Sequence, residues 1–146
     1  EAGILAFMGI PAVVTRDRMP FMTLLALHFD EVTIRIALRR TPTAQALLKA
    51  VPFESTIQTR GAQVLFDCPI RVSSESNATN IVQPGDIAFW SDGSCLAIAF
   101  GKTPTSQGSE IRLSYPCNIC GDALDEVTKL KSVKAGTRVR VEFAES

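Results

Sequence analysis

The sequence is poor in histidine, tryptophan and tyrosine, with one of each among 146 residues. Fifteen basic residues balance fifteen acidic ones, so we expect no large basic face for nucleic acid. The basic residues Arg39, Arg40, Arg138 and Arg140 are interpreted as charges on solvated strand faces. No Ser-His-Asp or Cys-His arrangement can form without His28, whose strand-like surroundings predict a structural or surface role. Glycine-rich phosphate loops are also absent from the sequence.

The sequence has no long apolar run. Its most apolar stretch, residues 4–14, has eleven residues and contains Gly9 and Pro11, whereas a membrane-spanning helix needs about 20. Glu1 precedes this stretch, where a secretory signal would carry positive charge. We therefore expect no membrane role. We interpret residues 1–20 as an N-terminal arm or extra strand and residues 21–146 as one domain.

The four cysteines do not match a complete metal or disulfide framework. Cys117 and Cys120 form one close pair, but structural zinc usually needs four ligands, and Cys68 and Cys95 could contribute only if the fold brought them there. Asp122 follows closely and would disfavour a redox-active thiolate. Ordinary strand cysteines are the favoured interpretation, with a redox pair and a metal site as alternatives. We therefore predict no metal, no cofactor and a reduced, cytoplasmic protein.

Most of the remaining pattern is typical of strands. Residues 32–39 alternate apolar and polar side chains, as a half-buried strand does, and residues 23–29 before them are strand-like. Asp30-Glu31 predicts a tight hairpin between these two strands. Turn and loop residues predict a hairpin at 91–94 and loops at 73–84 and 103–110. Further strands are expected at residues 53–59, 63–72, 85–90, 95–100, 111–119 and 138–143.

Two short helices complete the pattern. Thr41-Pro42 predicts a helix start, because threonine caps free N–H groups and proline suits the first helical position; Pro52 ends this helix. Asp122 is expected to cap a second helix through Leu130. Its inward-facing residues would be Leu124, Val127 and Leu130. About eight strands without a β-α-β rhythm favour a mainly antiparallel barrel with helices at its ends.

Several short motifs occur in an order and at a spacing that together are fairly specific to one protein family. They are Thr41-Pro42-Thr43-Ala44, Glu54-Ser55-Thr56, Gly85-Asp86-Ile87-Ala88-Phe89-Trp90, Phe100-Gly101-Lys102-Thr103-Pro104, and Asn118 with Gly121. Through them, from about Thr23 to Phe143, the sequence resembles the small uncharacterised cyclophilin-like proteins of bacteria and archaea. The resemblance implies a mainly β fold: a closed eight-stranded cyclophilin-like barrel with two short helices.

Cyclophilins catalyse rotation about the bond before proline, whose barrier is about 18–20 kcal/mol. Their site is similar to a shallow apolar groove with one arginine, aromatic residues and a glutamine. Here Cys95 stands where cyclophilins carry a glutamine, and Ala97 where they carry a phenylalanine. The segment that carries their catalytic arginine has no clear counterpart. Arg60 is the nearest basic candidate, with Gln63 three residues further on.

The sequence therefore predicts a module that binds a small ligand or a peptide without strong catalysis. The candidates for the groove are Arg60, Gln63, Phe89, Trp90 and Phe100. Strand alternation puts Phe89 and Trp90 on opposite faces, so one belongs to the core and the other is free to line a cleft, although core packing alone also explains both. Two alternatives stay open: a peptidyl-prolyl isomerase in which Arg60 polarises the amide, and a structural protein that self-assembles through residues 1–20. The expected partner is a small molecule or a proline-containing peptide.

Overall fold

The computed structural model describes residues 23–144. The predicted N-terminal arm, residues 1–20, lies outside them. The elements in chain order are β1 (Leu24–Phe29), β2 (Val32–Leu38), α1 (Pro42–Ala50), β3 (Phe53–Thr59), β4 (Gln63–Asp67), β5 (Thr79–Val82), β6 (Asp86–Trp90), β7 (Cys95–Ala99), β8 (Ile111–Ala123), the 3-10 helix η2 (Val127–Ser132) and β9 (Arg138–Phe143). Within residues 23–144, no helix has the length and apolar character needed to cross a membrane.

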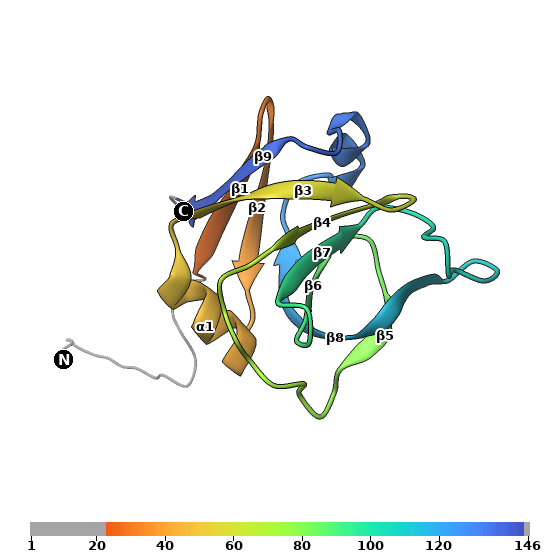
Figure 1. Cartoon of the computed structure of the whole chain (residues 1–146), viewed down its shortest axis with the longest axis horizontal. Coiled ribbons are helices and arrows are strands. Elements are labelled where there is room, and N and C mark those ends of the chain that lie inside the picture. Colours follow the sequence, from red (N-terminus) through yellow and green to blue (C-terminus); the bar gives the residue numbers. More distant parts are fainter. Residues whose placement is uncertain (1–22, 145–146) are drawn as a thin grey trace.

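The strands form one antiparallel, ring-like sheet. Their order is β2-β1-β9-β3-β4-β7-β6-β8-β5, and β2 also pairs with β8. Figure 1 shows the strands following one another around the ring, with α1 near β2 and the start of β3, and with β5 on the side away from β1. The predicted mainly β fold is confirmed. The sheet contains nine strands, where the sequence predicted eight.

Three predictions about local structure were wrong. Leu124, which was expected to face inward, is 43% exposed. The predicted loop at residues 73–84 contains β5, which forms because its backbone pairs with β8, from Thr79 with Cys117 to Val82 with Ile111. The predicted helix from Asp122 is replaced by the end of β8 and by η2. Asp122 stays in the strand because its backbone pairs with both β2 and β6, and tertiary pairing outweighs local helix signals.

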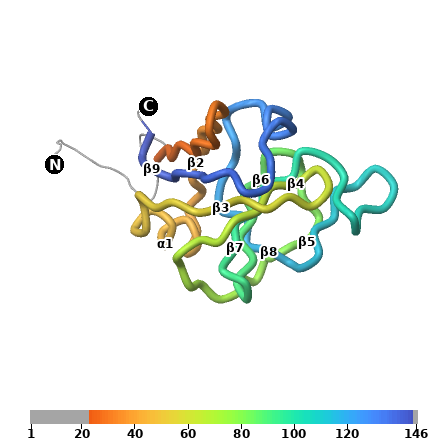
Figure 2. Tube along the Cα trace, turned by 45° about the horizontal axis from the view of Figure 1, so that its top comes forward, coloured from red at the N-terminus to blue at the C-terminus, as the bar shows by residue number. Residues whose placement is uncertain are grey.

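Alternation along the strands divides the apolar side chains between two clusters. The main core lies inside the ring and includes Phe66 of β4, Phe89 of β6, and Leu96 and Ile98 of β7. The second cluster uses the other faces of β6 and β7 and packs against β5 and the first half of β8. Its buried members are Val82, Ala88, Ala97, Ala99, Ile111, Leu113 and Cys117. Figure 2 shows β4, β5, β7 and β8 together on this side of the molecule.

A buried polar network joins α1 to the loop before β5. The amide of Asn118 is 1% exposed and donates to the Thr43 hydroxyl and the Ser73 carbonyl, both at 3.0 Å. Its oxygen accepts from the Glu75 N–H at 2.8 Å, and the Glu75 carboxylate accepts from the N–H and hydroxyl of Thr43 at 3.1 and 2.6 Å. Both the oxygen and the nitrogen of the Asn118 side chain have partners in this network, so the role of Asn118 is structural.

Candidate functional site

A cavity of about 200 Å³ lies beside the second apolar cluster. Leu65 of β4, Ala97 of β7, and Leu113 and Cys117 of β8 contribute apolar lining. The cavity exists because small side chains on the outer faces of the strands leave room that a large residue would fill. Ala97 is the clearest case, since it stands where cyclophilins carry a phenylalanine.

Two stacked aromatic rings form one wall of the cavity. The rings of Trp90 and Tyr115 lie 4.5 Å apart between centroids, with their planes 5° from parallel. The backbone of Gly93 also approaches the indole, because a Cβ built on Gly93 would lie 2.2 Å from Cε3 of Trp90. Tyr115 is 50% exposed. Trp90 is therefore held between Tyr115 and the β6–β7 hairpin.

Gln63 places an unpartnered polar group in the cavity lining. The residue is 6% exposed and starts β4, where it shares the outer face with Leu65 and Asp67. No hydrogen bond links its side-chain amide to any of residues 23–144. An amide has two donors and a carbonyl acceptor, and a buried group of this kind costs free energy when it has no partner. Water or a ligand in the cavity is needed to complete it.

Arg60 lies beside Gln63 at the β3–β4 turn. Its backbone N–H donates to the backbone carbonyl of Gln63 at 3.0 Å. The exposed side chain of Arg60 lines the cavity. No carboxylate of the described chain forms an ion pair with its guanidinium. Gly61 has a φ of 60°, which suits glycine, and a Cβ there would lie 3.0 Å from the Lys102 carbonyl oxygen. The turn is therefore packed closely against the loop after β7.

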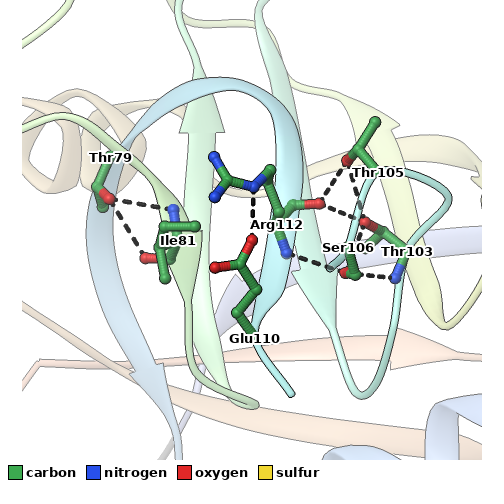
Figure 3. A network of polar contacts seen from close by, with 7 residues as sticks. All are labelled: Thr79, Ile81, Thr103, Thr105, Ser106, Glu110 and Arg112. Atoms are coloured by element: carbon green, nitrogen blue, oxygen red, sulfur yellow. Dashed lines mark hydrogen bonds and ion pairs between the residues drawn. The ribbon is translucent and has the colours of Figure 1, made fainter. Parts of the chain in front are cut away.

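That loop is held by a network of hydroxyl groups, shown in Figure 3. The Ser106 hydroxyl accepts from the N–H groups of Thr103 and Arg112, both at 3.0 Å, and the Thr105 hydroxyl donates to the Arg112 carbonyl at 2.7 Å. The hydroxyl of Thr103 donates to the same carbonyl. Glu110 forms an ion pair with Arg112 at 2.6 Å. The network supports the turn that carries Arg60 and Gln63, although its own residues lie outside the cavity.

Two cysteine thiols line the cavity. Burial is the main reason that the pKa of Cys95 is raised to about 11; the Asp67 carboxylate raises it further, whereas the Phe66 backbone and Arg60 lower it. Burial also raises the pKa of Cys117 to about 12. Cys120 belongs to the main core and Cys117 to the second cluster, so this pair does not face one environment. All four cysteines are free, and the two in the cavity are protonated at neutral pH.

The structure brings three of the five predicted groove residues together. Arg60, Gln63 and Trp90 line the cavity. Phe89 and Phe100 do not: Phe89 is fully buried inside the ring, because alternation turns it away from Trp90, and Phe100 packs against the main core. Tyr115, Leu113 and Asp67 also line the cavity, although none of them was predicted. Position 115 had a signal, because it holds the chain's single tyrosine in a stretch expected to be extended.

The other chemically notable residues lie away from the cavity. His28 on β1 contacts the Thr33 hydroxyl and the Glu142 carboxylate, both at 3.0 Å, which fits the structural role expected from the sequence. Among residues 23–144, no three His, Cys, Asp or Glu side chains are grouped so that they could hold a metal ion.

The Cyclophilin-like family model matches residues 23–142, and the chain belongs to this family. The solution structure of the hypothetical protein AF2241 from Archaeoglobus fulgidus is similar, with a TM-score of 0.72 and 30% sequence identity. That match covers 84% of this chain and 95% of AF2241. No curated protein matches the sequence.

The structure of McbB in complex with tryptophan is similar at a TM-score of 0.60. The sequences are 16% identical, and the match covers 84% of this chain and 45% of McbB. At this identity the similarity concerns the fold.

Proposed function

We propose that this protein binds a small organic ligand or a short peptide in the cavity between β4, β7 and β8. The observation that carries the proposal is Gln63, a buried amide that faces a cavity and has no hydrogen-bond partner in the described chain. Apolar lining with a few placed polar groups is typical of small-molecule sites. McbB, whose fold is similar over 45% of its chain, was determined in complex with tryptophan.

The chemistry of the lining favours binding over strong catalysis. The thiols of Cys95 and Cys117 have pKa values near 11 and 12, so neither is a nucleophile at neutral pH. The single histidine lies elsewhere, on β1. Arg60 and Asp67 are exposed charged residues of the lining, and they are suited to ligand recognition through charge.

A fragment screen by 15N–1H NMR tests the proposal. We expect bound fragments and short peptides to shift the backbone amide signals of cavity residues, including Leu65 and Ala97. Ala97→Phe should abolish these shifts because the added ring fills the cavity, whereas Leu124→Phe, at an exposed site outside the lining, should retain them. A screen with no hits, or hits that survive Ala97→Phe, would contradict the proposal.

Prolyl isomerisation is the second candidate function. The adjacency of Arg60 and Gln63 in an apolar cavity favours it, because a guanidinium near the proline nitrogen weakens the partial double bond of the amide. Exchange spectroscopy on an Ala-Pro peptide is the test, since uncatalysed exchange takes about 10–100 s. Acceleration that disappears in Arg60→Ala would support an isomerase. No acceleration at high protein concentration would exclude this candidate.

We also retain self-assembly through residues 1–20 as a third candidate. A chain that begins at Met22 should have a smaller assembly size in light scattering if these residues join subunits. An unchanged number of subunits in the assembly would argue against an assembly arm.

A further inference from the structure

We propose that the cavity selects N-acylated apolar amino acids, the chemistry that the C-terminus of a peptide also presents. Such ligands carry a free carboxylate, an amide one carbon away and an apolar side chain. This inference rests on the proposed function, since it names the ligand class for the same cavity. Three observations carry it: the unpartnered Gln63 amide, the neighbouring Arg60 guanidinium, and the position of Asp67 relative to both.

The first step concerns the partner that Gln63 lacks. Its side chain offers N–H donors and a carbonyl acceptor within one planar group. A secondary amide is a complementary group, because it offers one acceptor and one donor, either of which can pair with this side chain. A ligand without an amide would leave part of the buried Gln63 side chain unpaired, at a cost in affinity of tenfold or more.

The second step concerns the distance between the two polar groups of the ligand. The backbone N–H of Arg60 donates to the backbone carbonyl of Gln63 at 3.0 Å across a tight turn, and both residues line the cavity. A guanidinium binds a carboxylate through two parallel hydrogen bonds. A ligand whose carboxylate and amide lie close together, as in an N-acyl amino acid, therefore suits two binding groups carried by one turn.

The third step concerns orientation. Asp67 is four residues along β4 from Gln63, which is about 13 Å for an extended strand, and it lines the cavity on the same strand face. Its carboxylate repels an anionic group, so the acid of the ligand is directed toward Arg60. Leu65, Ala97 and Leu113 lie in the same lining and receive the apolar side chain.

Titration followed by tryptophan fluorescence tests the inference, because Trp90 is the single tryptophan and lines the cavity. The probes are N-acetyl-L-leucine, N-acetyl-L-leucinamide and L-leucine. We expect N-acetyl-L-leucine to bind at least tenfold more tightly than either other probe. Arg60→Ala should reduce the preference for the acid over the leucinamide to about one, whereas Arg71→Ala, an exposed arginine outside the lining, should retain it.

Equal binding of the acid and the leucinamide would overturn the inference, and so would an acid preference that persists in Arg60→Ala. If the leucinamide bound as tightly as the acid and Ala97→Phe abolished the binding of both, the proposed function would stand and this ligand class would be wrong. If neither these probes nor the fragment screen gave binding at the cavity, both would be wrong.

Discussion

Two buried amide side chains, Asn118 and Gln63, differ in what completes their hydrogen bonds. Asn118 is 1% exposed and Gln63 is 6% exposed, so both are removed from bulk water. Asn118 donates to Thr43 and Ser73 and accepts from Glu75. Gln63 has no side-chain partner in the described chain and faces a cavity. The difference shows which amide serves the fold and which is available to a ligand.

The largest effect should come from breaking the complete network. Asn118→Leu keeps the branching of the side chain but leaves the Glu75 N–H, the Ser73 carbonyl and the Thr43 hydroxyl without this partner. We expect the free energy of unfolding to fall by about 3 kcal/mol, because each buried group left unpaired costs about 1–3 kcal/mol and neighbouring groups share the loss. Urea denaturation measures it. A loss below about 1 kcal/mol would show that the network does not stabilise the fold.

The next effect concerns the aromatic wall. In Gly93→Ala the new Cβ would meet the Trp90 ring at 2.2 Å, so the ring must leave its stack with Tyr115. We expect a loss of about 2 kcal/mol, as in overpacked sites, together with a shifted Trp90 emission spectrum. Gly108→Ala is the control for the emission spectrum, because no atom lies within 4 Å of its Cβ; its positive φ costs stability without moving Trp90. An unchanged emission spectrum in Gly93→Ala would contradict the packing described here.

Gln63→Met should have a smaller effect on stability. The substitution replaces the unpartnered amide by an apolar chain of similar shape, so the free energy of unfolding should stay within about 1 kcal/mol of the natural protein or rise slightly. Binding of N-acetyl compounds should weaken in the same variant. A destabilisation as large as that of Asn118→Leu would remove the contrast between the two amides.

The smallest effect on stability is expected at an exposed ion pair, which serves as a reference for the effects at the two buried amides. Hydrogen bonds from the Arg35 side chain and backbone, with the Arg35 charge, lower the pKa of Asp125 to about 2, and the closest ion-pair distance is 3.0 Å. Asp125→Asn should cost about 1 kcal/mol or less near pH 7. Because the folded-state pKa is depressed, this contribution is complete above about pH 4 and disappears as the pH falls through 2. Melting temperatures of both proteins from pH 7 to 2 should therefore converge, and a constant difference would contradict the assignment.

The sequence predicted those features that depend on local pattern. Alternation at residues 32–38 identified β2 and its buried Ile34 and Ile36, although Ala37, expected on the outer face, is also buried. Thr41-Pro42 identified the start of α1, where the Thr41 hydroxyl accepts from the Ala44 N–H at 3.1 Å. Arg60 and Gln63 were named together as groove candidates because Gln63 follows three positions after Arg60. These features depend on strand period and capping chemistry, which a short window of sequence contains.

Features that depend on distant partners were not predictable in the same way. β5 has only four residues, and its pairing is supplied by β8. Asp122 carries a helix-start signal, but Arg39 and the backbones of β2 and β6 hold it in a strand. The difference between Asn118 and Gln63 depends on whether Thr43, Ser73 and Glu75 are near. No pattern around either amide contains that information.

The decisive experiment compares the side-chain NH2 signals of Gln63 and Asn118 in one 15N–1H spectrum during titration with N-acetyl-L-leucine. We expect the Gln63 signals to shift to saturation with the fluorescence change of Trp90, while the Asn118 signals stay in place. Saturable binding that leaves the Gln63 signals unmoved would contradict the claim that this amide is completed by a ligand.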